Sequence, residues 1–137
     1  MQASSITLVG ILLLALITVE SGGYFLTKVG RGSVPANTLQ KNFFRAGHAH
    51  AAVLLVLSIA VLAVVDQAGL SGFWEWVAKT GIPISAILMP AGFFLSVIGK
   101  DPKRPNGLLG LLWVGATLLT IGLLTAGIAL VRAGITA

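Results

Sequence analysis

Four long apolar runs, separated by short polar segments, constrain this chain more than any other feature of its sequence. The runs cover residues 6–28, 43–65, 81–99 and 108–131. Each is close to the ~20 residues that an α-helix needs to cross about 30 Å of hydrocarbon. A helix also satisfies all of its own backbone hydrogen bonds, as a segment inside a bilayer must. We therefore expect an all-α fold, in which residues 1–137 form a single integral membrane four-helix bundle.

Composition supports a membrane protein and excludes several other classes. Hydrophobic residues make up 56% of the chain and charged residues only 9%, whereas a soluble domain has about 25% charged residues. There is no cysteine, so disulfides and thiolate ligands are excluded. The first apolar run is longer than the ~7–15 residues of a signal-peptide core, and no basic residue precedes Lys28, so we expect it to be retained as a helix.

The basic residues are distributed unevenly between the two sides of the predicted bundle. The chain's net charge of +5 could suit a nucleic acid, but the basic residues lie in short loops, so we expect the lipid bilayer as partner and no nucleic acid. The first and third loops share seven of them: Lys28, Arg31, Lys41, Arg45, Lys100, Lys103 and Arg104. The opposite side has only Lys79 and Arg132. This asymmetry predicts that both termini lie outside a bacterial-type inner or plasma membrane.

The segment from Gly69 to Thr80 contains three aromatic residues beside a glutamate and a lysine. Aromatic residues with charged neighbours prefer the boundary between membrane and water. We therefore expect this segment to lie along the membrane surface, before the third span begins at residue 81.

Few side chains in the predicted spans can take part in chemistry. They are Glu20, Tyr24, His48 and His50, with Asp66 at a span end. Ionisable residues within a span are costly and are candidates for function. Glu20 and His50 lie about 12 Å and about 10 Å from the loop-one ends of their spans, by the rise of a helix. A carboxylate at that depth is expected to orient the imidazole of a histidine ligand through its second nitrogen.

The spacing of the two histidines predicts that their side chains diverge. Positions i and i+2 differ by about 200° around a helix, so His48 and His50 cannot easily chelate one metal ion. One can face its own bundle while the other faces a second subunit, which favours a homo-oligomer, with a trimer preferred. The neighbouring residues 46, 47, 49, 51 and 52 are all glycine or alanine. They are expected to leave room for a large flat group or a close helix.

Each of these features also has a purely structural interpretation. Polar residues near a span end often only form a hydrogen bond with a neighbouring helix. Glu20 can serve in the same way as a helix-pairing carboxyl group, and Tyr24 as an interfacial anchor. Gly115, Gly122 and Ala129 recur every seven residues in the fourth run, and such a stripe of small residues is typical of ordinary helix packing.

The stretch Gly47-His48-Ala49-His50-Ala51-Ala52-Val53-Leu54-Leu55 resembles helices in subunit I of the haem-copper oxidases. In that family one helix opens with Ala-His-Ala, and its histidine ligates the low-spin haem. Another helix carries His-x-His, whose histidines serve two haems on opposite faces. The resemblance covers about residues 43–98. It does not extend to the family's copper site, its cross-linked tyrosine or the remaining eight of its twelve helices.

The resemblance implies a small haem-binding membrane protein, with a b-type haem as cofactor and a role in electron transfer or in redox or gas sensing. His48 and His50 are the candidate haem ligands, and Glu20 is the candidate supporting residue. Two alternatives remain open, namely a structural or accessory subunit of a larger membrane complex and a small oligomeric transporter or proton conductor. The sequence has no phosphate-binding loop and no nucleophile with a paired base, and it leaves enzymatic activity open.

The charge asymmetry makes a testable prediction about orientation. Single cysteines introduced at Gln2 and at Ser33 should react with membrane-impermeant thiol reagents from opposite sides of the membrane. In intact cells, we expect labelling at residue 2 and protection at residue 33. Labelling at residue 33 from outside would reverse the predicted orientation.

Overall fold

The computed structural model describes residues 1–137 and consists of helices and connecting loops without any strand. The long helices are α1 (Ala3–Gly30), α2 (Thr38–Val65), α3 (Gly72–Ser96) and α4 (Gly110–Thr136). Two short 3₁₀ turns, η1 (Asp66–Ala68) and η2 (Gly107–Leu109), follow α2 and precede α4. All four long helices are apolar and long enough to cross a membrane. The predicted all-α fold with four spans is confirmed.

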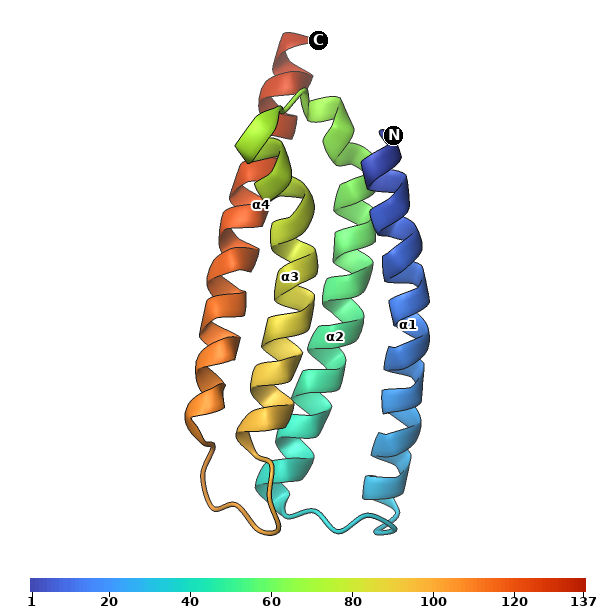
Figure 1. Cartoon of the computed structure of the whole chain (residues 1–137), viewed down its shortest axis with the longest axis vertical. Coiled ribbons are helices and arrows are strands. Elements are labelled where there is room, and N and C mark those ends of the chain that lie inside the picture. The colour runs from blue at the N-terminus through green and yellow to red at the C-terminus, as the bar shows by residue number, and fades with distance from the viewer.

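The helices lie side by side in the order of the chain, each antiparallel to the next (Figure 1). Helix α3 packs against both α2 and α4, while α1 packs mainly against α2. Both chain ends lie at one end of the bundle, and the α1–α2 and α3–α4 loops lie at the other (Figure 1). This places the seven basic residues of the two loops at the end opposite the termini.

The expectation that residues 69–80 lie along the membrane surface is wrong for most of the segment. Helix α3 begins at Gly72, and Val77, Ala78 and Lys79 are already buried. The chain turns between α2 and α3 over residues 66–71, with a left-handed backbone at Gly69 (φ 64°). The aromatic and charged residues of the segment belong to the first turns of α3.

Glycines let α3 approach its neighbours at backbone distance. A Cβ atom added at Gly81 would lie 3.1 Å from the Cα of Gly122, and one added at Gly92 would lie 2.5 Å from the backbone nitrogen of Leu112. A Cβ atom at Gly115 would lie 2.6 Å from Met89 Cγ. Gly115 and Gly122 therefore pack within the chain, as the structural interpretation of their stripe predicted. They are not available to a subunit interface, so they do not support the predicted trimer.

Polar side chains fasten the α3–α4 loop to the beginning of α2. Asn37 and Gln40 form a reciprocal capping box at the start of α2, which satisfies two of its free backbone donors. The buried Gln40 amide also donates to the backbone oxygens of Val97 (3.1 Å) and Gly99 (2.9 Å). The Asn37 amide donates to Asp101 Oδ1 (2.8 Å), and this bond, with nearby Lys103, lowers the pKa of the Asp101 carboxyl.

We predict that Gly92→Ala destabilises the protein, because the added methyl group would overlap the backbone of Leu112. Overpacking of this kind costs about 1–3 kcal/mol. The matched control is Gly127→Ala in α4, where nothing lies within 4 Å of an added Cβ atom. That change should be neutral or stabilising by up to about 1 kcal/mol, since alanine favours a helix over glycine. Reversible unfolding in detergent measures both, and equal effects would contradict the packing of α3 on α4.

Candidate functional site

His48 lies in the contact between α2 and α1. Its half-buried ring rests against two consecutive glycines of α1. A Cβ atom added at Gly22 would lie 3.3 Å from His48 Nδ1, and one added at Gly23 would lie 3.6 Å from Nε2. Neither ring nitrogen forms a hydrogen bond within the chain. The missing side chains of the two glycines make the space that this imidazole fills.

His50 faces the other neighbour of α2. Its ring centroid lies 4.9 Å from that of Phe93 on α3, and its Nδ1 lies 2.7 Å from the backbone oxygen of Ala46. Because a carbonyl oxygen can only accept, this contact assigns the ring proton to Nδ1. The Nε2 atom has no partner in the chain. A backbone carbonyl that fixes Nδ1–H and leaves Nε2 free is a usual arrangement for a histidine ligand.

The two imidazoles therefore diverge, as the helical repeat predicted. His48 contacts α1 and His50 contacts α3. They do not converge on a common point, and no group of three or more His, Cys, Asp or Glu side chains lies close enough to hold a metal ion. One chain therefore contains no metal site with three or more such protein ligands, whereas a haem iron needs only one or two.

Glu20 is separated from both histidines. Its side chain is exposed on α1 and forms no hydrogen bond or ion pair within the chain. Glu20 and His48 lie at similar heights in the bundle, because His48 rests on Gly22 and Gly23, which are less than one turn from Glu20 along α1. Gly22 lies about 160° and Gly23 about 60° around α1 from Glu20. The Glu20 carboxyl group is exposed and forms no hydrogen bond with either histidine. The backbone oxygen of Ala46, and not Glu20, orients the imidazole of His50.

Tyr24 is 65% exposed and does not bond to Glu20, although it is one turn away on the same helix. The ammonium group of Lys28 lies over its ring, 4.6 Å from the centroid. This arrangement agrees with an aromatic side chain near the end of a span. The phenol oxygen has no hydrogen-bond partner in the chain.

The space beside Gly47 is not open, contrary to the expectation that the small residues leave room there. A Cβ atom at Gly47 would lie 2.8 Å from the ring of Phe94. Phe94 stacks on Phe44 at 5.6 Å between centroids, and Phe44 meets Phe25 of α1 edge-on at 5.5 Å. Aromatic packing therefore joins α1, α2 and α3 beside the histidines, and any large ligand of His50 must lie outside this cluster.

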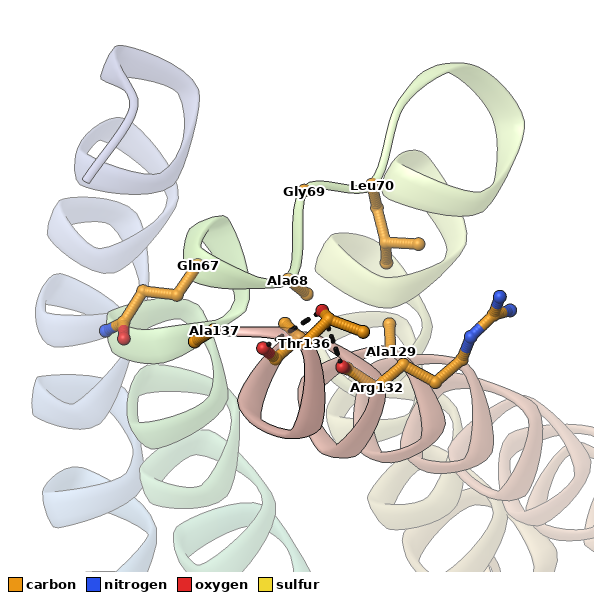
Figure 2. A pocket seen from close by; sticks show the side chains of 9 residues that line it. Gln67, Ala68, Gly69, Leu70, Ala129, Arg132, Thr136 and Ala137 are labelled. Atoms are coloured by element: carbon orange, nitrogen blue, oxygen red, sulfur yellow. Dashed lines mark hydrogen bonds between the residues drawn. The ribbon is translucent and has the colours of Figure 1, made fainter.

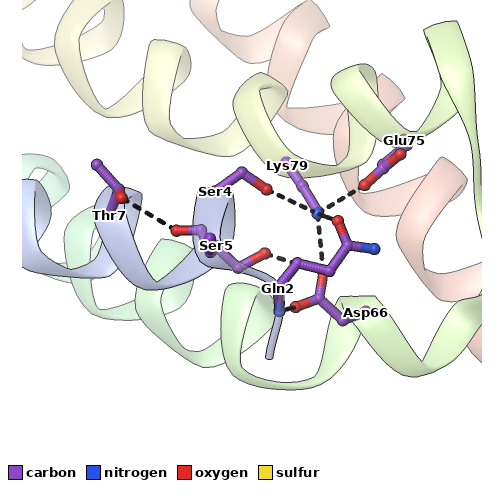
Figure 3. Close-up of polar contacts among 8 residues, drawn as sticks. Gln2, Ser4, Ser5, Thr7, Asp66, Glu75 and Lys79 are labelled. Atoms are coloured by element: carbon purple, nitrogen blue, oxygen red, sulfur yellow. Dashed lines mark hydrogen bonds and ion pairs between the residues drawn. The ribbon is translucent and has the colours of Figure 1, made fainter.

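A buried charge cluster lies at the other end of the bundle (Figure 3). Lys79 is only 5% exposed, and its ammonium group lies 2.8 Å from Asp66 Oδ1 and 2.7 Å from Glu75 Oε1. It also donates to Gln2 Oε1 at 2.9 Å. Asp66 accepts from Ser5 Oγ at 2.9 Å and from the backbone nitrogen of Gln2. We call these five residues the Lys79 cluster.

Sequence reasoning recognised Asp66 as an isolated ionisable residue and treated Lys79 as a surface residue. The only local signal was the spacing of Glu75 and Lys79, four residues apart in what is now a helix. Asp66 comes from the end of α2 and Gln2 from the start of α1, so the rest of the cluster depends on tertiary structure. The cluster joins three helices at one end and fixes their relative depth.

The largest surface hollow lies between residues 67–70 and the last turns of α4, with a volume of about 530 Å³ (Figure 2). It opens to the end of the bundle that holds the termini. Arg132 is its only charged side chain. None of the five larger hollows is lined by His48, His50 or Glu20, so the histidines do not lie in a preformed cavity.

Comparisons of the chain with protein-family models, with curated proteins and with solved structures gave no match. The resemblance to the haem-copper oxidases therefore stays a prediction, and the functional argument rests on the side-chain geometry described above.

We predict that Lys79→Met strongly destabilises the protein, because Asp66 and Glu75 would lose the ammonium group between them. Breaking a buried ion pair by removing one partner costs about 3–5 kcal/mol. The control is Lys103→Ala, which removes the exposed pair with Asp101 and should not measurably change stability. Unfolding in detergent measures both variants. Wild-type stability in Lys79→Met would show that the cluster does not hold the helices together.

Proposed function

We propose that this protein is a small integral membrane haem protein that senses a gas or a redox state, in which the Nε2 atom of His50 would hold a b-type haem. The observation that carries the proposal is the fixed imidazole of His50. Its Nδ1–H is held by Ala46 O at 2.7 Å and its ring by Phe93. Its free Nε2 is the atom that binds iron in histidine-ligated haem.

The divergence of the histidines favours sensing over electron transfer. His48 and His50 contact different helices, so one chain offers a single imidazole to a given haem. A haem held by one protein side chain could also bind a small molecule such as a diatomic gas. When bound, the haem would supply the redox and gas-binding chemistry, and His50 would hold and orient it.

His48 is a weaker candidate for the same role. Both of its ring nitrogens lie close to the backbone of α1 at Gly22 and Gly23, and no backbone oxygen fixes its ring. Its position agrees with packing between α1 and α2. Because the two histidines lie two residues apart on one helix, His48 provides a matched control for His50.

The two alternative functions are supported unequally. A proton conductor needs a connected relay, and Glu20 has no hydrogen bond to either histidine, so we do not propose one. An accessory subunit is the second candidate, because α1 has only three buried residues, Ser5, Leu12 and Val29. Such a sparsely packed outer helix leaves a long surface for another membrane protein.

The test is an absorbance spectrum of the protein purified from cells with ample haem supply. We expect a Soret band in the wild type and in His48→Ala, and its loss in His50→Ala. Carbon monoxide added to the reduced wild type should shift the band, since a haem held by His50 alone would be able to bind a gas.

Folding controls make the result decisive. All three proteins should elute as the same species in size-exclusion chromatography. They should also unfold at similar denaturant concentrations, because both histidines are only half-buried. If the wild type, His48→Ala and His50→Ala are equally stable and equally free of haem, the haem proposal is wrong. The accessory-subunit function would then be the better one.

A further inference from the structure

Glu20 is an ionisable side chain in an unusual place. It lies ten residues before the end of α1 at Gly30, which is about 15 Å along the helix axis. A glutamate side chain is too short to reach water over that distance. It is nevertheless exposed and has no hydrogen-bond or ion-pair partner within the chain. Polar groups at this depth almost always face protein or a water-filled cavity, and Glu20 lines none of the five larger hollows of the chain.

The face around Glu20 is continuous along α1. At 100° per residue, Leu13, Ile17 and Tyr24 lie within about 60° of Glu20 around the helix. All three are more than half exposed. Gly10 lies on the same side, and nothing lies within 4 Å of a Cβ atom added there. The buried residues Ser5 and Leu12 lie about 60° and 80° from Glu20 in the opposite direction around the helix, so Glu20 lies at the edge between the exposed face and the side that packs against the bundle.

We propose that this face of α1 binds a second copy of the chain, and that the Glu20 carboxyl group of each copy accepts a hydrogen bond from the Tyr24 phenol of the other. The surface contains an acceptor and a donor one turn apart, and neither has a partner within its own chain. Such a surface is self-complementary, as a two-fold interface requires. Interhelical hydrogen bonds of this type stabilise pairs of membrane helices.

The depths of the two groups agree with this pairing. Both copies carry the same basic loops and insert in the same orientation, so a two-fold axis along the membrane normal brings each residue to the level of its counterpart. Side chains on a helix lean toward its N-terminus, and the tyrosine side chain is the longer of the two, so the Tyr24 hydroxyl lies closer to the level of the Glu20 carboxyl group than the separation of about 6 Å along the axis implies. Lys28 lies over the face of the Tyr24 ring and leaves the hydroxyl free.

This interface does not involve the histidines, and it goes beyond the haem proposal. His48 and His50 lie on α2 and face α1 and α3 of their own chain. Loss of haem binding would leave the α1 interface unaffected, and loss of the interface would leave the Soret band in place. An experiment can therefore contradict one of the two proposals without contradicting the other.

The absence of cysteine in the chain allows a direct test by oxidative cross-linking in native membranes. Leu13→Cys places a thiol on the proposed face, one heptad before Glu20, where a pair of parallel helices stays in contact. Ile11→Cys is the matched control. The two positions are 54% and 57% exposed but lie about 200° apart around the helix.

We expect Leu13→Cys to form a disulfide-linked dimer of twice the chain mass, in at least about fivefold higher yield than Ile11→Cys. Adding Glu20→Leu or Tyr24→Phe to Leu13→Cys should lower that yield several-fold, whereas Glu20→Gln should retain most of it because the amide oxygen still accepts. All of these positions are exposed, so the monomer should stay folded. Equal yields at residues 11 and 13, a yield that Glu20→Leu does not change, or a product of another mass would overturn the proposal.

Discussion

Between apolar helices in a bilayer the hydrophobic driving force is small, because lipid chains are as apolar as leucine side chains. In this protein, van der Waals contact at glycines takes its place. Gly81 and Gly122 bring the backbones of α3 and α4 together, and Gly92 admits the backbone of Leu112. Helix α3 is accordingly the most buried of the four. The positions of the other helices follow from this close packing, since α2 and α4 both rest on α3.

Polar networks at both ends complement the apolar packing in the middle. At the end with the termini, the Lys79 cluster joins α1, α2 and α3. At the other end, Gln40 and Asn37 hold the α3–α4 loop against the start of α2. The contacts at glycines contain no directional bonds, so by themselves they do not fix how far one helix is shifted along another. Directional hydrogen bonds at the two ends fix the depth of each helix relative to its neighbours.

The remaining polar groups at membrane depth are dispersed over three surfaces. His48 lies between α1 and α2, His50 lies beside α3, and Glu20 faces outward from α1. This dispersion argues against a proton relay or a metal-ion centre within one chain. It agrees with the separate roles that we propose, in which His50 would hold a haem and Glu20 would take part in an interface. The hydrogen bond from His50 to Ala46 makes the imidazole independent of Glu20.

The sequence by itself determined the fold class, because four apolar runs of sufficient length can cross a bilayer only as helices. It also determined that His48 and His50 diverge, since the helical repeat fixes the angle between them. The start of α3 could not be placed, because aromatic residues beside charges occur both at membrane surfaces and in the first turns of a span. Only the tertiary structure decided the partners of Lys79, which come from three separate helices, and the direction of Glu20. Depth along a helix can be counted from the sequence, but the rotation of one helix against another depends on packing at residues such as Gly22, Gly23 and Gly47.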